Sequence, residues 1–293
     1  MNNRTSLRLL FIINPASGNK KVNYELEINN YMANHQYNVE CFVMPLQCPA
    51  DLIKKRIEQT KPDRVIATGG DGTIKLVAEC LMKTQIPLGI IPAGSANGMA
   101  KELAIPLNLN GALDIIINGH TTPVSMIKVN DELCIHLSDI GFNAFVVKKF
   151  EAGTGRGMWG YIKASWQVLR SHAKMHAKII VNKVLIERYA SMIVIANATR
   201  YGSGALINPV GTLDDKVFEV IVVKKISMME IFKMMVTHSN YNPQKTELFQ
   251  TDTLQINSKR KAHFQVDGEY RGKINHLEAS IIPNAVQVIV AKP

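Results

Sequence analysis

The stretch RVIATGGDGT, residues 64–73, joins an apolar run to a glycine-rich turn and sets the pattern for the first part of the chain. The run has the composition of a buried strand, and the residues after Thr73 have helical spacing. A turn without bulky side chains lets backbone N–H groups approach a phosphate, and the following helix N-terminus adds partial positive charge. The carboxylate of Asp71 is suited to holding Mg²⁺ or orienting a triphosphate among those donors. An ordinary turn is the alternative, because Asp-Gly is also typical of hairpins.

Two further loops of small residues follow apolar runs. Asn14–Gly18 follows a predicted strand at Leu7–Ile13, and Pro92–Ala100 follows another predicted strand. Predicted strands and helices alternate along this part of the chain, which favours a parallel sheet with helices on both faces. Ligands collect at the carboxyl ends of the strands in such sheets, where all three loops would lie. We therefore predict one phosphate-rich ligand rather than three unrelated helix caps.

The 293 residues carry a formal net charge of +10, which predicts anionic partners such as nucleotide phosphates, an acidic membrane surface or nucleic acid. The basic residues are dispersed, and Lys259–Lys261 is too short a run for a nucleic-acid track, so no nucleic acid is expected. Four cysteines without a C-x-x-C spacing indicate reduced thiols in the cytoplasm. No run approaches the roughly 20 apolar residues of a membrane span, so any membrane contact is expected to be peripheral.

The pattern changes near residue 124 to short alternating strands with close turns, which predicts an antiparallel sandwich or barrel. We therefore divide the chain into an α/β domain, residues 1–124, and a β-sandwich domain, residues 125–293. Helical inserts are expected at Gly160–Met175 and Ser227–Thr237. The predicted turns are Asn130-Asp131, Asn182-Lys183, Asp267-Gly268 and Pro283-Asn284.

Aromatic and basic residues are mixed along Phe145–Arg170. Such a segment suits an amphipathic surface resting on an anionic membrane. Equally, its aromatic residues can cap the core of the sandwich while its basic residues lie in water. The sequence leaves both interpretations open.

Two acidic positions stand out in the second domain. Asp214-Asp215 lies in a turn and is either a site for a hard cation or an ordinary surface turn. Asp267-Gly268-Glu269 ends a predicted strand, and a carboxylate there is either a solvated hairpin charge or a general base.

Taken in order, these motifs resemble the diacylglycerol kinase catalytic-domain family, in particular its soluble bacterial lipid kinases, which are related to sphingosine and ceramide kinases. The GGDGT run alone is shared with NAD kinases, whereas the ordered set is specific. The motifs are Asn14-Pro15-x-Ser17-Gly18, Gly69-Gly70-Asp71-Gly72-Thr73, Pro92-x-Gly94-Ser95-x-Asn97, Gly141-Phe142-Asn143-Ala144, Asp214-Asp215 and Asp267-Gly268-Glu269.

The resemblance implies a two-domain fold with ATP and Mg²⁺ in the cleft between the domains. It implies that Asp71 organises the metal and the phosphates, and that Glu269, or in second place Asp267, takes the proton from a lipid hydroxyl. The implied ATP-binding residues are Asn14, Pro15, Ala16, Ser17, Gly18, Gly69, Gly70, Asp71, Gly72, Thr73, Ser95 and Asn97. The implied ligands of a second, structural Mg²⁺ are the side chain of Asp215 and the backbone carbonyls of Thr212 and Val217.

The chain departs from the bacterial pattern at several positions. Gly98 and Asn143 stand where many members have aspartate, and Lys216 replaces the glycine that usually follows Asp215. Asp139 is an unusual carboxylate that can partly restore the lost charge. These departures suggest a subgroup whose acceptor need not be diacylglycerol.

The resemblance therefore implies an ATP-dependent lipid kinase that phosphorylates a diacylglycerol-like or sphingoid hydroxyl at an anionic membrane surface. An NAD kinase is one alternative, because that class shares the GGDGT turn. A non-catalytic protein that binds nucleotide or lipid is another, because two carboxylates of the family pattern are replaced. Edge strands of the sandwich would allow a homodimer.

Overall fold

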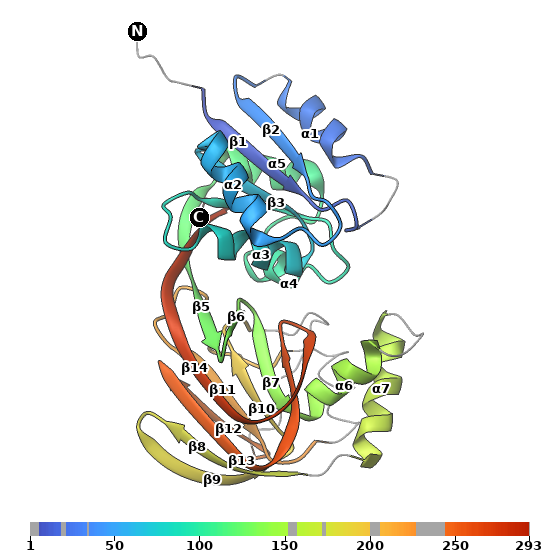
Figure 1. Cartoon of the computed structure of the whole chain (residues 1–293), viewed down its shortest axis with the longest axis vertical. Coiled ribbons are helices and arrows are strands. Elements are labelled where there is room, and N and C mark those ends of the chain that lie inside the picture. Colours follow the sequence, from blue (N-terminus) through green and yellow to red (C-terminus); the bar gives the residue numbers. More distant parts are fainter. Residues whose placement is uncertain are drawn as a thin grey trace. The chain divides into compact units, whose positions relative to one another are not determined.

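The computed structural model describes residues 6–18, 22–33, 35–151, 157–171, 174–199, 206–226 and 244–292 (Figure 1). The chain forms two compact units, one of Met1–Val124 with Asn284–Pro293 and one of Ser125–Pro283. The sequence-based division assigns residues 284–293 to the sandwich, whereas the structure assigns them to the first unit. The difference arises because strand β14 (Glu269–Val290) runs from one unit into the other and pairs with β4 (Leu88–Pro92) at Val288.

The first unit is built on a parallel sheet. Its strands β1 (Arg8–Ile13), β2 (Asn38–Val43), β3 (Arg64–Gly69) and β4 lie in the order β2-β1-β3-β4. Residues 9–13 of β1, 65–69 of β3 and all of β4 are buried, as expected for strands covered on both faces.

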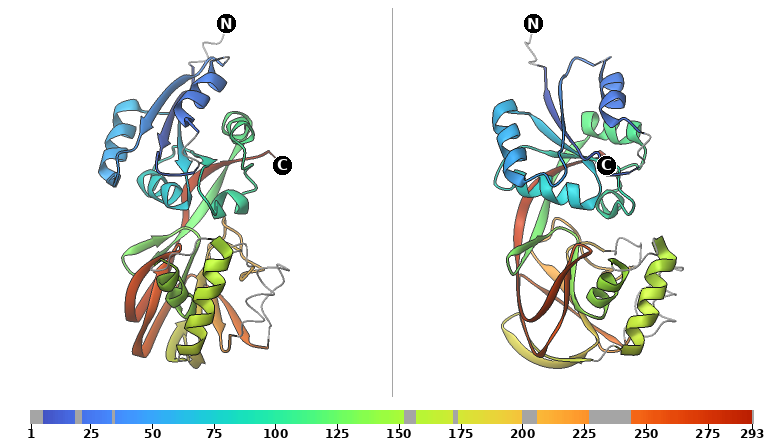
Figure 2. Two further views of the ribbon diagram at one scale, coloured as in Figure 1. Left: turned by 90° about the vertical axis from the view of Figure 1, so that its right-hand side faces the viewer. Right: turned by 45° about the vertical axis from the view of Figure 1, so that its right-hand side comes forward.

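The strand order also determines where the helices lie. The crossover from β1 to β2 runs in one direction across the sheet, and those from β2 to β3 and from β3 to β4 run in the other. Because parallel crossovers are right-handed, the helices of the two directions cover opposite faces, as Figure 2 shows. The predicted parallel sheet with helices on both faces is therefore confirmed. The helices are α1 (Tyr24–Met32), α2 (Ala50–Thr60), α3 (Asp71–Leu81), α4 (Gly98–Glu102) and α5 (Leu109–Asn118).

The second unit contains antiparallel strands and two described helices, which confirms the predicted sandwich. The insert expected at Gly160–Met175 is a helix over Gly157–Ser171, whereas Met175 begins a strand, and the helix Phe142–Glu151 is not predicted from the sequence. The strands pair in the order β12-β11-β10-β7-β13-β14, and β8 and β9 extend from β13. The second expected insert, Ser227–Thr237, lies outside the described residues. The elements are β5 (His120–Val129), β6 (Glu132–Cys134), β7 (Leu137–Gly141), α6 (Phe142–Glu151), α7 (Gly157–Ser171), β8 (Met175–Val181), β9 (Val184–Ala190), β10 (Met192–Ala196), β11 (Phe218–Val223), β12 (Thr246–Thr251) and β13 (Thr253–Val266).

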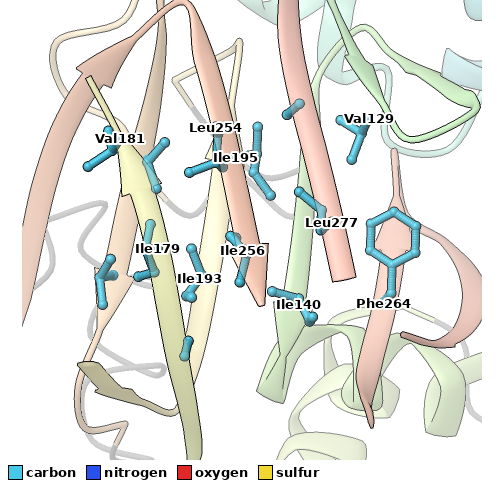
Figure 3. Close-up of a cluster of buried hydrophobic side chains, with 14 of the residues drawn as sticks. Val129, Ile140, Ile179, Val181, Ile193, Ile195, Leu254, Ile256, Phe264 and Leu277 are labelled. Carbon is cyan, nitrogen blue, oxygen red and sulfur yellow. The ribbon is translucent and has the colours of Figure 1, made fainter. Parts of the chain in front are cut away.

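Strand β10 is apolar throughout and β11 is apolar except for Glu219, and all residues of both strands are buried. Ile193 and Ile195 point into the cluster shown in Figure 3, which includes residues from β7, β8 and β13. Met192 and Val194 point to the other side, into a second cluster that includes Val168 of α7. These contacts support the core-capping interpretation for the inner face of the helical insert.

Backbone conformation confirms three of the four predicted turns. Asn130, Asn182 and Asp267 all have positive φ, the left-handed conformation that tight turns require. The prediction that a turn at Pro283-Asn284 separates two strands is wrong, because β14 continues through these residues as one strand. The positive φ of Asn284 marks only a local irregularity.

Among the described helices, none is both long enough and apolar enough to cross a membrane.

Glu247 of β12 accepts charged hydrogen bonds from Arg188 of β9 at 2.8 Å and from Lys224 at 2.5 Å. Its partial burial alone would raise the pKa, but Lys224 and Arg188 together hold the pKa of this carboxyl below its ordinary value. The carboxylate therefore stabilises the fold above the ordinary value of 4.5, and this contribution is lost as the pH falls through the lower pKa of the folded state.

We expect Glu247→Gln to lower the free energy of unfolding by about 1 kcal/mol at pH 7. The difference from wild type should shrink as the pH falls below 4.5. Denaturant unfolding at pH 7 and at lower pH measures both values. Glu278→Gln is the control, because Glu278 lies in the same unit and its side chain is 57% exposed. An equal loss in both variants, or a loss independent of pH, would contradict this role.

Candidate functional site

Asn14 connects the loop after β1 to the turn after β3. Its side-chain Nδ2 donates to the hydroxyl of Thr73 at 2.9 Å, and its Oδ1 accepts from the N–H of Ala16 at 3.0 Å. Its own N–H donates to the carbonyl of Thr68 at 3.0 Å. In the order β2-β1-β3-β4 the connections change direction between β1 and β3, which is where ligands bind in open α/β sheets.

The loop after β4 packs directly on the other two loops. The N–H of Ala93 donates to the carbonyl of Gly69 at 2.8 Å. A Cβ at Gly94 would lie 2.5 Å from the Cα of Gly70, and a Cβ at Gly18 would overlap the carbonyl oxygen of Ala93. Only glycine allows these approaches, so the structure brings the three predicted loops together within the first unit.

Asp71 has a role that the sequence does not predict. Its carboxylate accepts from the N–H groups of Gly98 and Met99, both at 3.0 Å, and so holds the start of α4. Asn97 has a positive φ of 51°, and its side-chain amide bonds both the N–H and the carbonyl of Gly94. Asp71 and Asn97 therefore fix the shape of the loop after β4.

The three loops form a cradle of small residues that suits a phosphate. The N–H groups of Asp71 and Gly72 in the first turn of α3 have no partner inside the helix, so they are available to an anion. The residues of the cradle that are exposed are Pro15, Ala16, Gly18, Gly72 and Ser95. Those that are half-buried are Asn14, Ser17, Gly70 and Asp71, and those that are buried are Gly69, Thr73 and Asn97.

In the second unit, Asp267 is engaged by backbone donors. Its carboxylate accepts from the N–H groups of Ile135 at 3.2 Å, His136 at 2.9 Å and Leu137 at 3.3 Å. Because these bonds use the carboxylate to hold the turn between β13 and β14, the geometry favours Glu269 over Asp267 as a general base.

The side chain of Glu269 is 58% exposed and lies 2.6 Å from Nη2 of Arg271. Nε of Arg271 also lies 3.0 Å from Glu132 of β6, so one arginine links two carboxylates. Arg271 is the extra residue of a β-bulge, and the following Gly272 has a φ of +98°. The sequence pattern does not predict this triad. Its only signal is the spacing of Glu269 and Arg271, which places both on one face of a strand.

The acidic turn around Asp215 is held by Ser125 of β5. The Ser125 hydroxyl donates to the carbonyl of Asp215 at 2.6 Å, and its N–H donates to the carbonyl of Leu213 at 2.7 Å. Within the described residues, no group of three or more His, Cys, Asp or Glu side chains is arranged for a metal ion. A site of one carboxylate and two backbone carbonyls, as expected for Asp215, Thr212 and Val217, would not form such a group.

Glu219 is a buried carboxylate beside this turn that sequence patterns do not reveal. It accepts from Asn208 at 2.6 Å and from Gln250 at 3.0 Å. Burial raises the pKa of Glu219, and the nearby charge of Asp215 adds to that effect. The turn therefore places the charge of Asp215 near the buried carboxyl of Glu219, and Lys216 follows Asp215 in the chain.

Asp139 and Asn143 are paired, a contact that the sequence does not predict. Asn143 Nδ2 donates to Asp139 Oδ2 at 2.6 Å, and both residues are buried. A carboxylate from β7 therefore contacts Asn143, the position at which the resemblance implies an aspartate.

Two family models match this chain. One, described as the diacylglycerol kinase catalytic domain, matches residues 8–129, and one described as a YegS C-terminal NAD kinase beta sandwich-like domain matches residues 139–290. The chain therefore belongs to the diacylglycerol kinase catalytic-domain family.

One named relative agrees with this membership, and a second relative is uncharacterized. The chain is 26% identical to a diacylglycerol kinase of Staphylococcus aureus over 275 residues, which cover 91% of this chain and 87% of that protein. It is 34% identical to an uncharacterized protein of Synechocystis sp. over 200 residues, which cover 64% of this chain and 46% of that protein. The chain thus spans less than half the length of the second relative.

Solved structures show the same fold. A diacylglycerol kinase of Bacillus anthracis aligns with a TM-score of 0.73 at 19% identity, over 98% of this chain and 97% of that one. An NAD kinase of Archaeoglobus fulgidus in complex with ATP aligns with a TM-score of 0.54 at 11% identity, over 98% of this chain and 94% of that one. At these identities the likeness shows the fold alone, so it does not choose between the two kinase classes.

The contact between Gly94 and Gly70 leads to a stability prediction. We expect Gly94→Ala to destabilise the first unit by about 2 kcal/mol, because the new Cβ would meet backbone that cannot move aside freely. Hydrogen exchange of the β3 and β4 amides measures the loss. Ser95→Ala changes the next, exposed residue and should stay within about 0.5 kcal/mol of wild type. Equal protection in all three proteins would show that the loops are not packed as described.

Proposed function

We propose that the protein is an ATP-dependent lipid kinase that transfers the γ-phosphate of ATP to a diacylglycerol-like or sphingoid hydroxyl. The observation that carries the proposal is the convergence of three glycine-bearing loops at the β1/β3 switch point. Membership of the diacylglycerol kinase catalytic-domain family supports a lipid as the acceptor.

The first unit supplies the nucleotide site. Phosphoryl transfer depends on positioning and on neutralisation of charge, so a cradle of backbone donors suits it. In the proposal, Asn14–Gly18 and Gly69–Thr73 hold the phosphates together with Ser95 and Asn97. Mg²⁺, when bound, neutralises charge on the phosphates. The Asp71 carboxylate keeps free lone pairs for the hydrated metal after accepting its two N–H groups.

The second unit supplies the base. In the proposal, Glu269 takes the proton from the lipid hydroxyl, because its side chain is exposed whereas Asp267 is held by three N–H groups. The net charge of +10 favours peripheral contact of the protein with an anionic membrane, where such an acceptor resides.

The direct assay mixes purified protein, Mg²⁺ and γ-labelled ATP with micelles that each contain one lipid of a panel. Wild type should label at least one lipid. Glu269→Gln should lower kcat by at least about 100-fold, the scale of general-base catalysis. Glu278→Gln removes an exposed carboxylate of the same strand and should retain activity. Full activity of Glu269→Gln would contradict the assigned base.

The same assay separates the alternatives left open by the sequence. Formation of NADP from added NAD would assign the chain to NAD kinases, whose fold it shares. Binding of ATP without transfer to any acceptor would assign it to non-catalytic relatives. Labelled lipid without NADP excludes both.

We further propose that Asp215 binds a structural Mg²⁺ with the backbone carbonyls of Thr212 and Val217. Mg²⁺ should then raise the melting temperature of wild type, and EDTA should reverse the rise. Asp215→Asn should remove the effect, whereas Asp214→Asn, a change at the adjacent exposed aspartate, should retain it. A melting temperature that does not respond to Mg²⁺ in wild type would contradict this site.

A further inference from the structure

Gln265 lies buried beneath the turn that carries Glu269. It is 1% exposed and stands on β13 directly opposite Asp139 of β7, so the two side chains share one face of the sheet. Gln265 Nε2 donates to Asp139 Oδ2 at 2.6 Å, and Gln265 Oε1 accepts from the N–H of Gly268 at 2.7 Å. One side chain therefore joins a buried carboxylate to the residue immediately before Glu269.

The chemistry of the partners fixes the orientation of the Gln265 amide. A carboxylate only accepts and a backbone N–H only donates. A flipped amide would therefore place its oxygen against the Asp139 carboxylate and its NH2 group against the N–H of Gly268. Asn143 Nδ2 also donates to Asp139 Oδ2, at 2.6 Å. Asp139 is thus the common acceptor that orients Gln265.

Packing alone does not account for this arrangement. Asp139, Asn143 and Gln265 are 0%, 4% and 1% exposed, and burying such groups is costly unless every bond is made. The turn above them needs restraint, because Asp267 and Gly268 both have positive φ, 50° and 84°. Asp267 binds the turn to the chain before β7, and Gln265 binds the residue that follows Asp267.

We propose that Gln265, oriented by Asp139, is a positioning residue for Glu269. By holding the N–H of Gly268 it fixes the backbone from which the Glu269 side chain extends toward the acceptor. This inference rests on the proposed role of Glu269 as general base. Displacement of a reacting group by about 1 Å costs on the order of 100-fold in rate, so a loosened turn should be visible in kcat.

The test compares Gln265→Met with Ser138→Ala. Methionine keeps the length of glutamine but makes neither hydrogen bond. The Ser138 hydroxyl donates to the backbone carbonyl of Gln265 at 2.7 Å and is equally buried, so its loss removes one bond from the same place without touching the turn.

In Gln265→Met the Gly268 amide should exchange at least about tenfold faster, and kcat should fall at least about tenfold, with the KM for ATP unchanged. Ser138→Ala should leave the exchange, kcat and KM near wild type.

A charge exchange keeps the test valid if Gln265→Met does not fold. Gln265→Glu alone places a second carboxylate against that of Asp139. The two charges repel each other, so kcat should fall. The double variant Asp139→Asn with Gln265→Glu restores a donor opposite an acceptor and leaves an oxygen for Gly268. The side-chain amide of Asn143 must then turn over, so that its Oδ1 accepts the second N–H of the new amide at position 139. It should recover most of the lost kcat and of the protection at Gly268.

The outcomes separate this inference from the proposed function. Active wild type with an unchanged kcat in folded Gln265→Met, or with no recovery in the double variant, overturns the positioning role alone. Wild type that phosphorylates no lipid overturns the proposed function, and the positioning role falls with it. The role is established if kcat falls in the single variants and recovers in the double variant together with the protection of the Gly268 amide against hydrogen exchange.

Discussion

The hydrogen bond from Asn14 to the hydroxyl of Thr73 is the contact on which the first unit's site depends. It joins the loops after β1 and β3 at the point where the strand order reverses. Glycines at positions 70 and 94 then let the loop after β4 close against them. Three chain segments that are far apart in sequence therefore present one surface of small residues and backbone donors, which is what a polyphosphate requires.

Each unit uses the same physical device to hold its loops, namely a carboxylate that accepts backbone N–H groups from another segment. Asp71 does so for Gly98 and Met99 in the first unit, and Asp267 does so for His136 and its neighbours in the second. Charge-assisted bonds of this kind are stronger than neutral ones, so they restrain loops that are otherwise exposed. They also explain why aspartates at motif positions matter to geometry as well as to chemistry.

Much of the fold follows from the sequence because the responsible patterns are local. The apolar run before Gly69 predicts a buried strand, and Asp267-Gly268 predicts a tight turn, and both are present. The partners of Asp71 and the triad around Arg271 depend on strand register and on a β-bulge, which no local pattern encodes. Gln265 is unpredictable for the same reason, since only the register of β13 against β7 places it opposite Asp139.

In the proposed function, the three loops of the first unit bind the triphosphate of ATP. A crystal structure with a non-hydrolysable ATP analogue and Mg²⁺ tests it most directly. The β- and γ-phosphates should contact the N–H group of Gly72 and residues of the loop Asn14–Gly18, where the N–H groups of Asn14, Ala16 and Ser17 already have partners. Phosphates bound away from these loops, or no binding at millimolar analogue, would contradict it.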